Sequence, residues 1–133
     1  MRMRHAATLG FAVALLAGCA GHKAPPTPIP DPVAFSGDET VKLDVSNHNW
    51  LDVVIYVVHS GQRTRVATVV ATGSASVVVP NHALRNSGGQ IRLLAHAIGN
   101  PNTFMSETIV ARPGMTIDWT LESDLKRSSL SVW

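Results

Sequence analysis

The sequence predicts an all-β fold over residues 39–133, a small antiparallel β-sandwich of about seven strands with an Ig-like or transthyretin-like arrangement. Three observations lead to this prediction. Short apolar runs recur about every 8–12 residues, and Gly, Asn, Ser or Pro separate them. Val and Thr, which favour strands, are abundant after residue 40. No stretch of this region keeps the 3.6-residue periodicity of an amphipathic helix.

Residues typical of turns separate the expected strands. The Asn-His-Asn segment at 47–49 predicts a turn, because Asn tolerates left-handed φ and hydrogen-bonds its own backbone. Ser-Gly-Gln at 60–62 is the strongest hairpin signal in the chain. Residues 81–89 form the longest loop, and a single helical turn over 82–84 is the alternative. The expected strands are residues 41–46, 51–59, 63–71, 74–79, 90–98, 104–111 and 115–122, with a short edge strand over 128–133 as a further expectation.

Hydrophobic patterning assigns interior positions to two of these strands. Residues 51–59 are apolar on both faces, which is typical of a central strand covered on both sides. Residues 115–122 alternate most regularly, with Ile117 and Trp119 on the apolar face. We therefore expect Trp119 to lie in the core.

A basic stretch and an apolar run open the chain. Arg2 and Arg4 precede residues 6–17, which are apolar apart from Thr8. This is the layout of a secretory signal peptide. The run is shorter than the roughly 20 apolar residues that a membrane-spanning helix needs. Residues 1–18 are therefore predicted to direct export and then to be removed.

Leu16-Ala17-Gly18-Cys19 resembles the lipobox of bacterial lipoproteins at all four positions. In that class the cysteine thiol receives a diacylglycerol, the signal is cut just before it, and the new amine is usually acylated. The resemblance implies cleavage between Gly18 and Cys19 and a lipidated Cys19. We expect no cofactor besides the lipid. Two or more acyl chains anchor a protein stably in a membrane, whereas one chain binds reversibly. Cys19 is also the only cysteine, so it has no disulfide partner within the chain. An ordinary secretory cleavage that leaves a free thiol, or an uncleaved anchor, is the alternative.

The residues after Cys19 indicate to which membrane the protein is sorted and how far from it the domain is held. Ala20 stands where an Asp, in the enterobacterial version of this family, retains the protein at the inner membrane, so the resemblance favours the outer membrane of the cell envelope. Residues 19–38 form a proline-rich linker. At about 3.1 Å per residue, polyproline geometry over 20–32 would hold the domain about 40 Å or less from the bilayer. A proline-rich ligand for another protein is the alternative interpretation.

Several motifs of residues 39–133 resemble a type of small uncharacterised bacterial lipoprotein domain. They are the run from Asn49-Trp50-Leu51-Asp52 through Tyr56-Val57-Val58 to Gly61-Gln62-Arg63, then Gly88-Gly89-Gln90, Pro113-Gly114 with Trp119, and Ser131-Val132-Trp133. The resemblance implies a fold and a cell-envelope location, and it implies no activity.

Charge argues against nucleic acid as a partner. The chain has 11 Lys and Arg against 9 Asp and Glu. Removal of the signal peptide takes away Arg2 and Arg4, which leaves 9 basic and 9 acidic residues. A neutral domain lacks the basic surface that nucleic-acid binding needs.

Six histidines raise the question of a metal site. His48, His59, His82 and His96 lie in the domain, without the close spacing that is typical of zinc ligands. We expect scattered surface histidines and no metal, although a sheet could bring His59 and His96 together. A periplasmic ligand-binding or metal-binding domain that uses these histidines is the alternative function.

Catalytic motifs are missing from the sequence. It contains neither a G-x-S-x-G nucleophile elbow nor a phosphate-binding glycine loop, so we expect no catalytic residues and no enzyme. Trp50 and Trp133 are candidates for a binding surface, since exposed aromatic residues are enriched in interfaces. Trp133 could equally close the open end of the sandwich. The sequence thus predicts a membrane-anchored lipoprotein of the cell envelope that acts as a non-catalytic binding or assembly module for an envelope protein.

Overall fold

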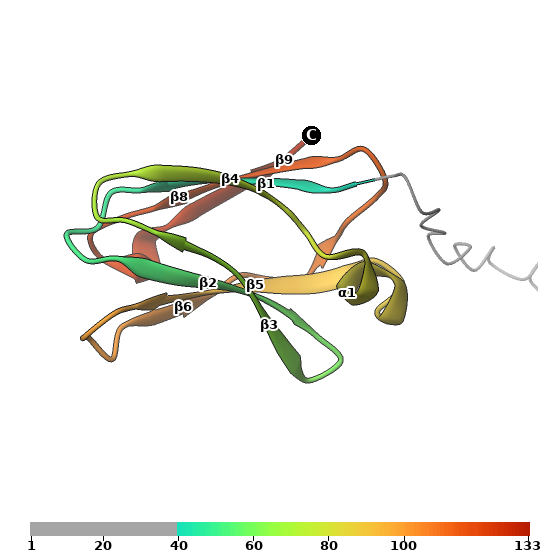
Figure 1. Cartoon of the computed structure of the whole chain (residues 1–133), viewed down its shortest axis with the longest axis horizontal. Coiled ribbons are helices and arrows are strands. Elements are labelled where there is room, and N and C mark those ends of the chain that lie inside the picture. Colours follow the sequence, from blue (N-terminus) through green and yellow to red (C-terminus); the bar gives the residue numbers. More distant parts are fainter. Residues whose placement is uncertain (1–39) are drawn as a thin grey trace, which may run out of the picture.

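Two β-sheets packed face to face make up residues 40–133, the part of the chain that the computed structural model describes (Figure 1). The predicted signal peptide, Cys19 and the whole predicted linker up to residue 38 lie outside the described residues. In chain order the elements are β1 (Lys42–Asn47), β2 (Val53–His59), β3 (Gln62–Val69), β4 (Ser74–Val78), α1 (Asn81–Asn86), β5 (Gln90–Ala97), β6 (Thr103–Met105), β7 (Ile109–Val110), β8 (Thr116–Leu121), the 3₁₀ turn η1 (Leu125–Arg127) and β9 (Ser129–Val132).

The β-sandwich class is confirmed, with one difference in strand direction. One sheet has the order β4-β1-β8-β9, and the other has the order β3-β2-β5-β6 with β7 also paired to β5. All pairs are antiparallel except β1 and β8, which run parallel from Lys42 beside Thr116 to Asn47 beside Leu121. A parallel pair needs a long connection. Here the whole second sheet and β4 form that connection.

Alternating residues of both sheets fill the core. On β1 and β8 the residues Leu43, Ile117 and Trp119 are buried, as the alternation predicts. Strand β2 lies between β3 and β5, and only one of its seven residues is more than slightly exposed. This confirms the prediction of a central strand. The two-residue turn after β2 has positive φ at both Ser60 and Gly61, the type I′ geometry that fits the twist of a hairpin.

The structure tests the predictions for two further segments, residues 81–89 and 104–111. Residues 81–86 form α1, so the helical alternative for this loop is confirmed. The single strand expected over 104–111 is wrong, because β6 ends at Met105 and β7 begins at Ile109. Ser106 explains the break: its hydroxyl accepts a hydrogen bond from the Leu93 amide at 2.9 Å and donates to the Glu107 carbonyl at 2.8 Å. The Ser106 hydroxyl thus accepts the hydrogen bond of the Leu93 amide, which a backbone carbonyl would accept in a regular strand pair.

The sandwich has two distinct ends. Residue 40, α1 and the β2–β3 hairpin lie at the end where the chain enters the described domain, which we call the proximal end (Figure 1). The loops after β1, β3, β5 and β8 lie at the opposite end, which we call the distal tip. A six-residue strand such as β1 separates the two ends by about 20 Å.

Candidate functional site

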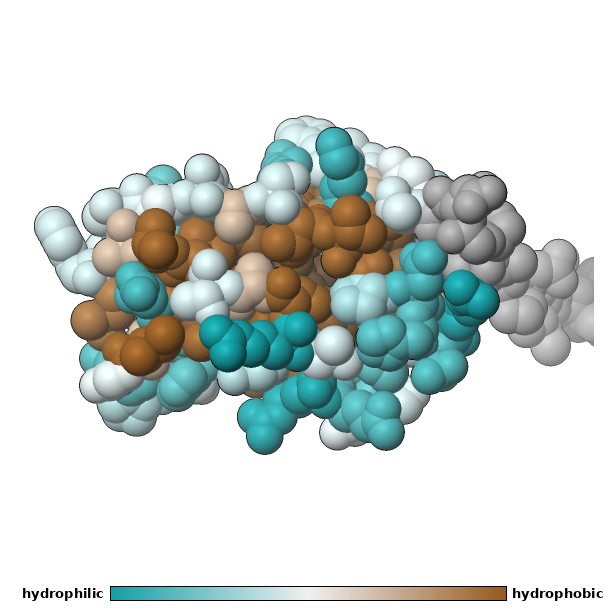
Figure 2. All heavy atoms as spheres, viewed as in Figure 1, coloured by the Kyte–Doolittle hydropathy of each residue, from teal (hydrophilic) through white to brown (hydrophobic). Residues whose placement is uncertain are grey.

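Exposed apolar side chains gather at the distal tip. Trp50 is 79% exposed, and Leu51, Val70 and Ile98 are exposed as well. Their loops adjoin, since the Ile98 amide donates to the Asp52 carbonyl at 2.8 Å. Figure 2 shows apolar residues that extend across the visible side of the sandwich to this end. An exposed apolar cluster with an aromatic residue is typical of a contact surface.

Asn47, at the end of β1, holds two of the tip loops together from inside. Its side chain is fully buried, and its amide nitrogen donates to the carbonyls of Leu51, Val69 and Val70 at 3.0, 3.2 and 2.9 Å. Its Oδ1 accepts from the Asn49 amide at 2.9 Å. Every polar atom of this side chain therefore has a partner, as a buried amide requires.

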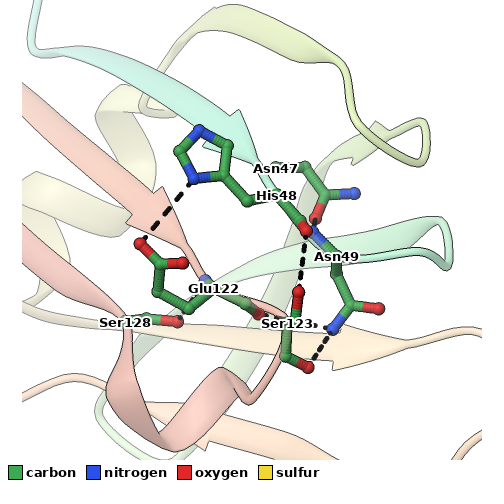
Figure 3. A network of polar contacts seen from close by, with 6 residues as sticks. All are labelled: Asn47, His48, Asn49, Glu122, Ser123 and Ser128. Carbon is green, nitrogen blue, oxygen red and sulfur yellow. Dashed lines mark hydrogen bonds and ion pairs between the residues drawn. The ribbon is translucent and has the colours of Figure 1, made fainter.

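Asn49 continues the network to the β8–β9 connection (Figure 3). Its Nδ2 donates to the carbonyls of Glu122 and Ser123 at 3.3 and 2.8 Å, and its Oδ1 accepts from the Leu51 amide at 3.0 Å. The Ser123 hydroxyl donates to the His48 carbonyl at 3.2 Å. Three loops that are distant in sequence are thus joined by hydrogen bonds to two buried asparagines.

The network orders the backbone on both sides of Trp50. Asn49 precedes Trp50 and Leu51 follows it, and both neighbours are hydrogen-bonded within the network. A partner that bound here would order the loop at a lower cost in conformational entropy, because the loop is already held in place. The sequence signals 47–49 as a turn, but it gives no sign that these two asparagines are buried.

A polar rim borders the apolar cluster. Glu122, Ser123, Asp124 and Arg127 line an open hollow of about 510 Å³ beside the asparagine network. His48 Nδ1 lies 3.7 Å from Glu122 Oε1, and both side chains are largely exposed. An apolar centre with charged residues at its edge is the usual anatomy of a protein–protein contact.

Trp133, the other predicted surface aromatic, lies at the proximal end. It is 71% exposed, and it exchanges two backbone hydrogen bonds of 3.1 Å with Thr116 at the start of β8. Trp50 belongs to the opposite end, so the structure does not bring the two predicted residues into one surface. Trp119 is buried beside Phe104 in the core, as the sequence predicts.

A groove of about 520 Å³ runs between the β6–β7 edge of one sheet and β9 of the other. Within residues 40–133, strand β9 pairs with β8 on one side only, so the expected edge strand at the C-terminus is confirmed. Its sequence contains none of the Lys or Pro residues that often protect an edge from pairing with another chain. The groove is lined mainly by Phe104, Ile109, Val110, Met115, Leu130 and Val132.

The four domain histidines do not form one cluster. His96 pairs with Val54 on the outer face of the second sheet, whereas His59 lies at the end of the inner face, about 16 Å along β2. The structure therefore does not bring His59 and His96 together. His59 is also not a surface residue, since it is 3% exposed. Among residues 40–133, no three or more His, Cys, Asp or Glu side chains are grouped as a metal site would require.

No protein-family model matches the chain, and no curated protein matches it by sequence. The chain is similar in structure to a protein from Eubacterium rectale solved by NMR, with 16% identity and a TM-score of 0.41, over 75% of this chain and 92% of that chain. No helix within the described residues has the length and apolar character to span a membrane.

Proposed function

We propose that this protein is a membrane-anchored lipoprotein of the cell envelope, and that its β-sandwich is a non-catalytic module that binds an envelope protein through the distal tip. The observation that carries the proposal is an exposed Trp50 with apolar neighbours, held by buried Asn47 and Asn49. Ordered aromatic residues of this kind dominate the binding energy of many interfaces.

The position of the tip supports a tethered binding module. The described domain begins at the proximal end, so the chain that leads back to Cys19 joins the sandwich opposite the tip (Figure 1). A lipid anchor on Cys19 and the prolines between residues 25 and 32 would present the tip away from the bilayer. A partner in the envelope could then reach Trp50 without contact with the lipid.

The anchor part of the proposal is tested with Cys19→Ala in cells. We expect the variant to remain unlipidated, to lack the mass of the acyl chains, and to leave the membrane fraction. The measurements are fractionation and intact-mass spectrometry of the purified protein. Unchanged mass and membrane association would refute the lipoprotein assignment.

The binding part is tested with two tryptophans at opposite ends of the sandwich. In-cell crosslinking of the lipidated protein, followed by mass spectrometry, should identify a dominant envelope partner. Trp50→Ala should lose this partner, with a loss of about 2 kcal/mol or more in binding free energy, because an exposed aromatic anchor is removed. Trp133→Ala is the matched control, since its side chain is exposed to a similar degree at the other end.

Three outcomes separate the possibilities. Loss of the partner with Trp50→Ala alone supports the tip as the contact surface. Loss with Trp133→Ala alone would contradict the tip and move the contact to the C-terminal edge strand β9. A dominant partner that neither variant affects would also refute the tip.

A further inference from the structure

His59 and Trp119 have buried ring nitrogens without a hydrogen-bond partner among residues 40–133. The Trp119 nitrogen can only donate a hydrogen bond, whereas an imidazole can also bind a metal ion. His59 ends β2 on the inner face of its sheet and is 3% exposed. Both ring nitrogens are buried, and neither has a hydrogen-bond partner in the described domain. Native proteins satisfy most buried polar atoms, so an unsatisfied imidazole calls for a ligand, ion or water as an explanation.

A second imidazole lies against the first. His82, in the first turn of α1, has its ring centroid 6.1 Å from that of His59, with an angle of 72° between the ring planes. A metal–nitrogen bond to histidine is about 2.0–2.1 Å long, so two imidazoles on one ion have centroids about 5–6 Å apart. The observed separation is close to that of two ligands of one ion.

The surroundings offer room and mobility. His82 is exposed, and its ring makes no hydrogen bond within residues 40–133, so its side chain can turn without breaking one. An open hollow of about 170 Å³ lies beside His59 on a side that His82 does not line, and its lining includes Ser60, Gln90 and Arg92. Water in this hollow could reach His59.

From these observations we propose that His59 and His82 bind a divalent transition-metal ion, such as Zn²⁺ or Cu²⁺, between β2 and α1. Neutral imidazole nitrogens are ligands that both ions accept. The protein would supply two ligands to the ion, and water would occupy the remaining coordination positions. Binding would give His59 the partner that it lacks and would fasten α1 to the second sheet.

The site is distinct from the distal tip that we propose to bind an envelope protein. It lies at the proximal end, near the point where the chain enters the described domain (Figure 1). Metal binding therefore does not depend on Trp50, and Trp50→Ala should leave it unchanged.

The experiment measures metal binding to the full-length lipidated protein in detergent. After removal of metal with a chelator, Zn²⁺ and Cu²⁺ are titrated separately by calorimetry, and the melting temperature is recorded with and without metal. We expect one ion per chain and a higher melting temperature with metal. His59→Leu and His82→Ala should each weaken binding at least about tenfold, since even the loss of groups that only support a ligand costs 10- to 100-fold.

Matched histidine variants serve as controls. His22→Ala, His48→Ala and His96→Ala should bind metal as the unchanged protein does. His59→Leu fills the same buried position with an apolar side chain, so it should fold at least as well without metal. Circular dichroism and the metal-free melting temperature verify this.

A spectroscopic readout locates the ion directly. Paramagnetic Cu²⁺ should broaden the amide resonances of Ala83 and Leu84, which follow His82 in α1, at substoichiometric concentration. Absence of one-to-one binding, equal affinity in His59→Leu, or loss of binding in a control variant would each overturn the proposal.

Discussion

Two buried polar side chains at opposite ends of the same sandwich differ in how they are satisfied. Asn47, at the distal tip, donates to three carbonyls and accepts from a backbone amide. His59, at the proximal end, has two buried ring nitrogens and no hydrogen-bond partner in the described part of the chain. Burial is nearly complete for both residues.

The difference separates a structural group from a candidate binding group. A fully paired amide stabilises the fold and leaves no atom for a ligand. A buried imidazole without a hydrogen-bond partner lowers the free energy of unfolding of the isolated protein. A ligand or ion that bound the imidazole would offset this cost. Substitutions at the two positions should therefore change stability in opposite directions.

The largest effect is expected for Asn47→Asp. The new carboxylate keeps the shape of the amide but faces the carbonyls of Leu51, Val69 and Val70 with no hydrogen to donate. The Asn49 amide still donates to Oδ1, but burying the charge against three carbonyls should lower the free energy of unfolding by about 4 kcal/mol or more. That is a large part of the 5–15 kcal/mol typical of a domain.

The measurement is urea unfolding followed by circular dichroism. Ser46→Asp, one residue earlier on the exposed face of β1, adds the same charge without burial and should change stability by less than about 0.5 kcal/mol. If the two variants were equally stable, the network would not hold the tip loops as we argue.

A smaller effect of opposite sign is expected for His59→Leu in the absence of metal. Removal of two unsatisfied nitrogens should raise the free energy of unfolding by about 1 kcal/mol, if leucine fills the volume of the ring. Urea unfolding in the presence of a chelator measures this change. A loss of stability of similar size would show that the imidazole has an internal partner, and the contrast with Asn47 would disappear.

Much of the fold follows from local sequence patterns. Alternation in β1 and β8, the two apolar faces of β2 and the Ser60-Gly61 turn each depend on neighbouring residues. The break between β6 and β7 does not, because it arises from a hydrogen bond between Ser106 and the distant Leu93. The parallel direction of β1 and β8 is likewise a property of the whole topology.

The candidate sites are less accessible to sequence reasoning for the same reason. Trp50 could be proposed as a surface residue, but the partners of Asn47 and Asn49 lie up to 74 residues away. His82 lies close to His59 because α1 packs against β2. The spacing of the two residues in the sequence does not indicate this contact. Side chains that meet through tertiary packing leave no periodic signal in the chain.

The smallest effect is expected for the exposed pair of His48 and Glu122, which adjoins the buried network. Its two side chains lie 3.7 Å apart and are largely in solvent, where ion pairs contribute about 0–1 kcal/mol. His48→Ala removes the ring but keeps the carbonyl that accepts from Ser123. We expect a double-mutant cycle of His48→Ala with Glu122→Gln to give a coupling below about 0.5 kcal/mol in urea unfolding. A coupling above about 1 kcal/mol would instead indicate that this exposed pair helps Asn47 and Asn49 to hold the loops of the distal tip. The contrast between buried and exposed polar groups would then no longer explain which residues order Trp50.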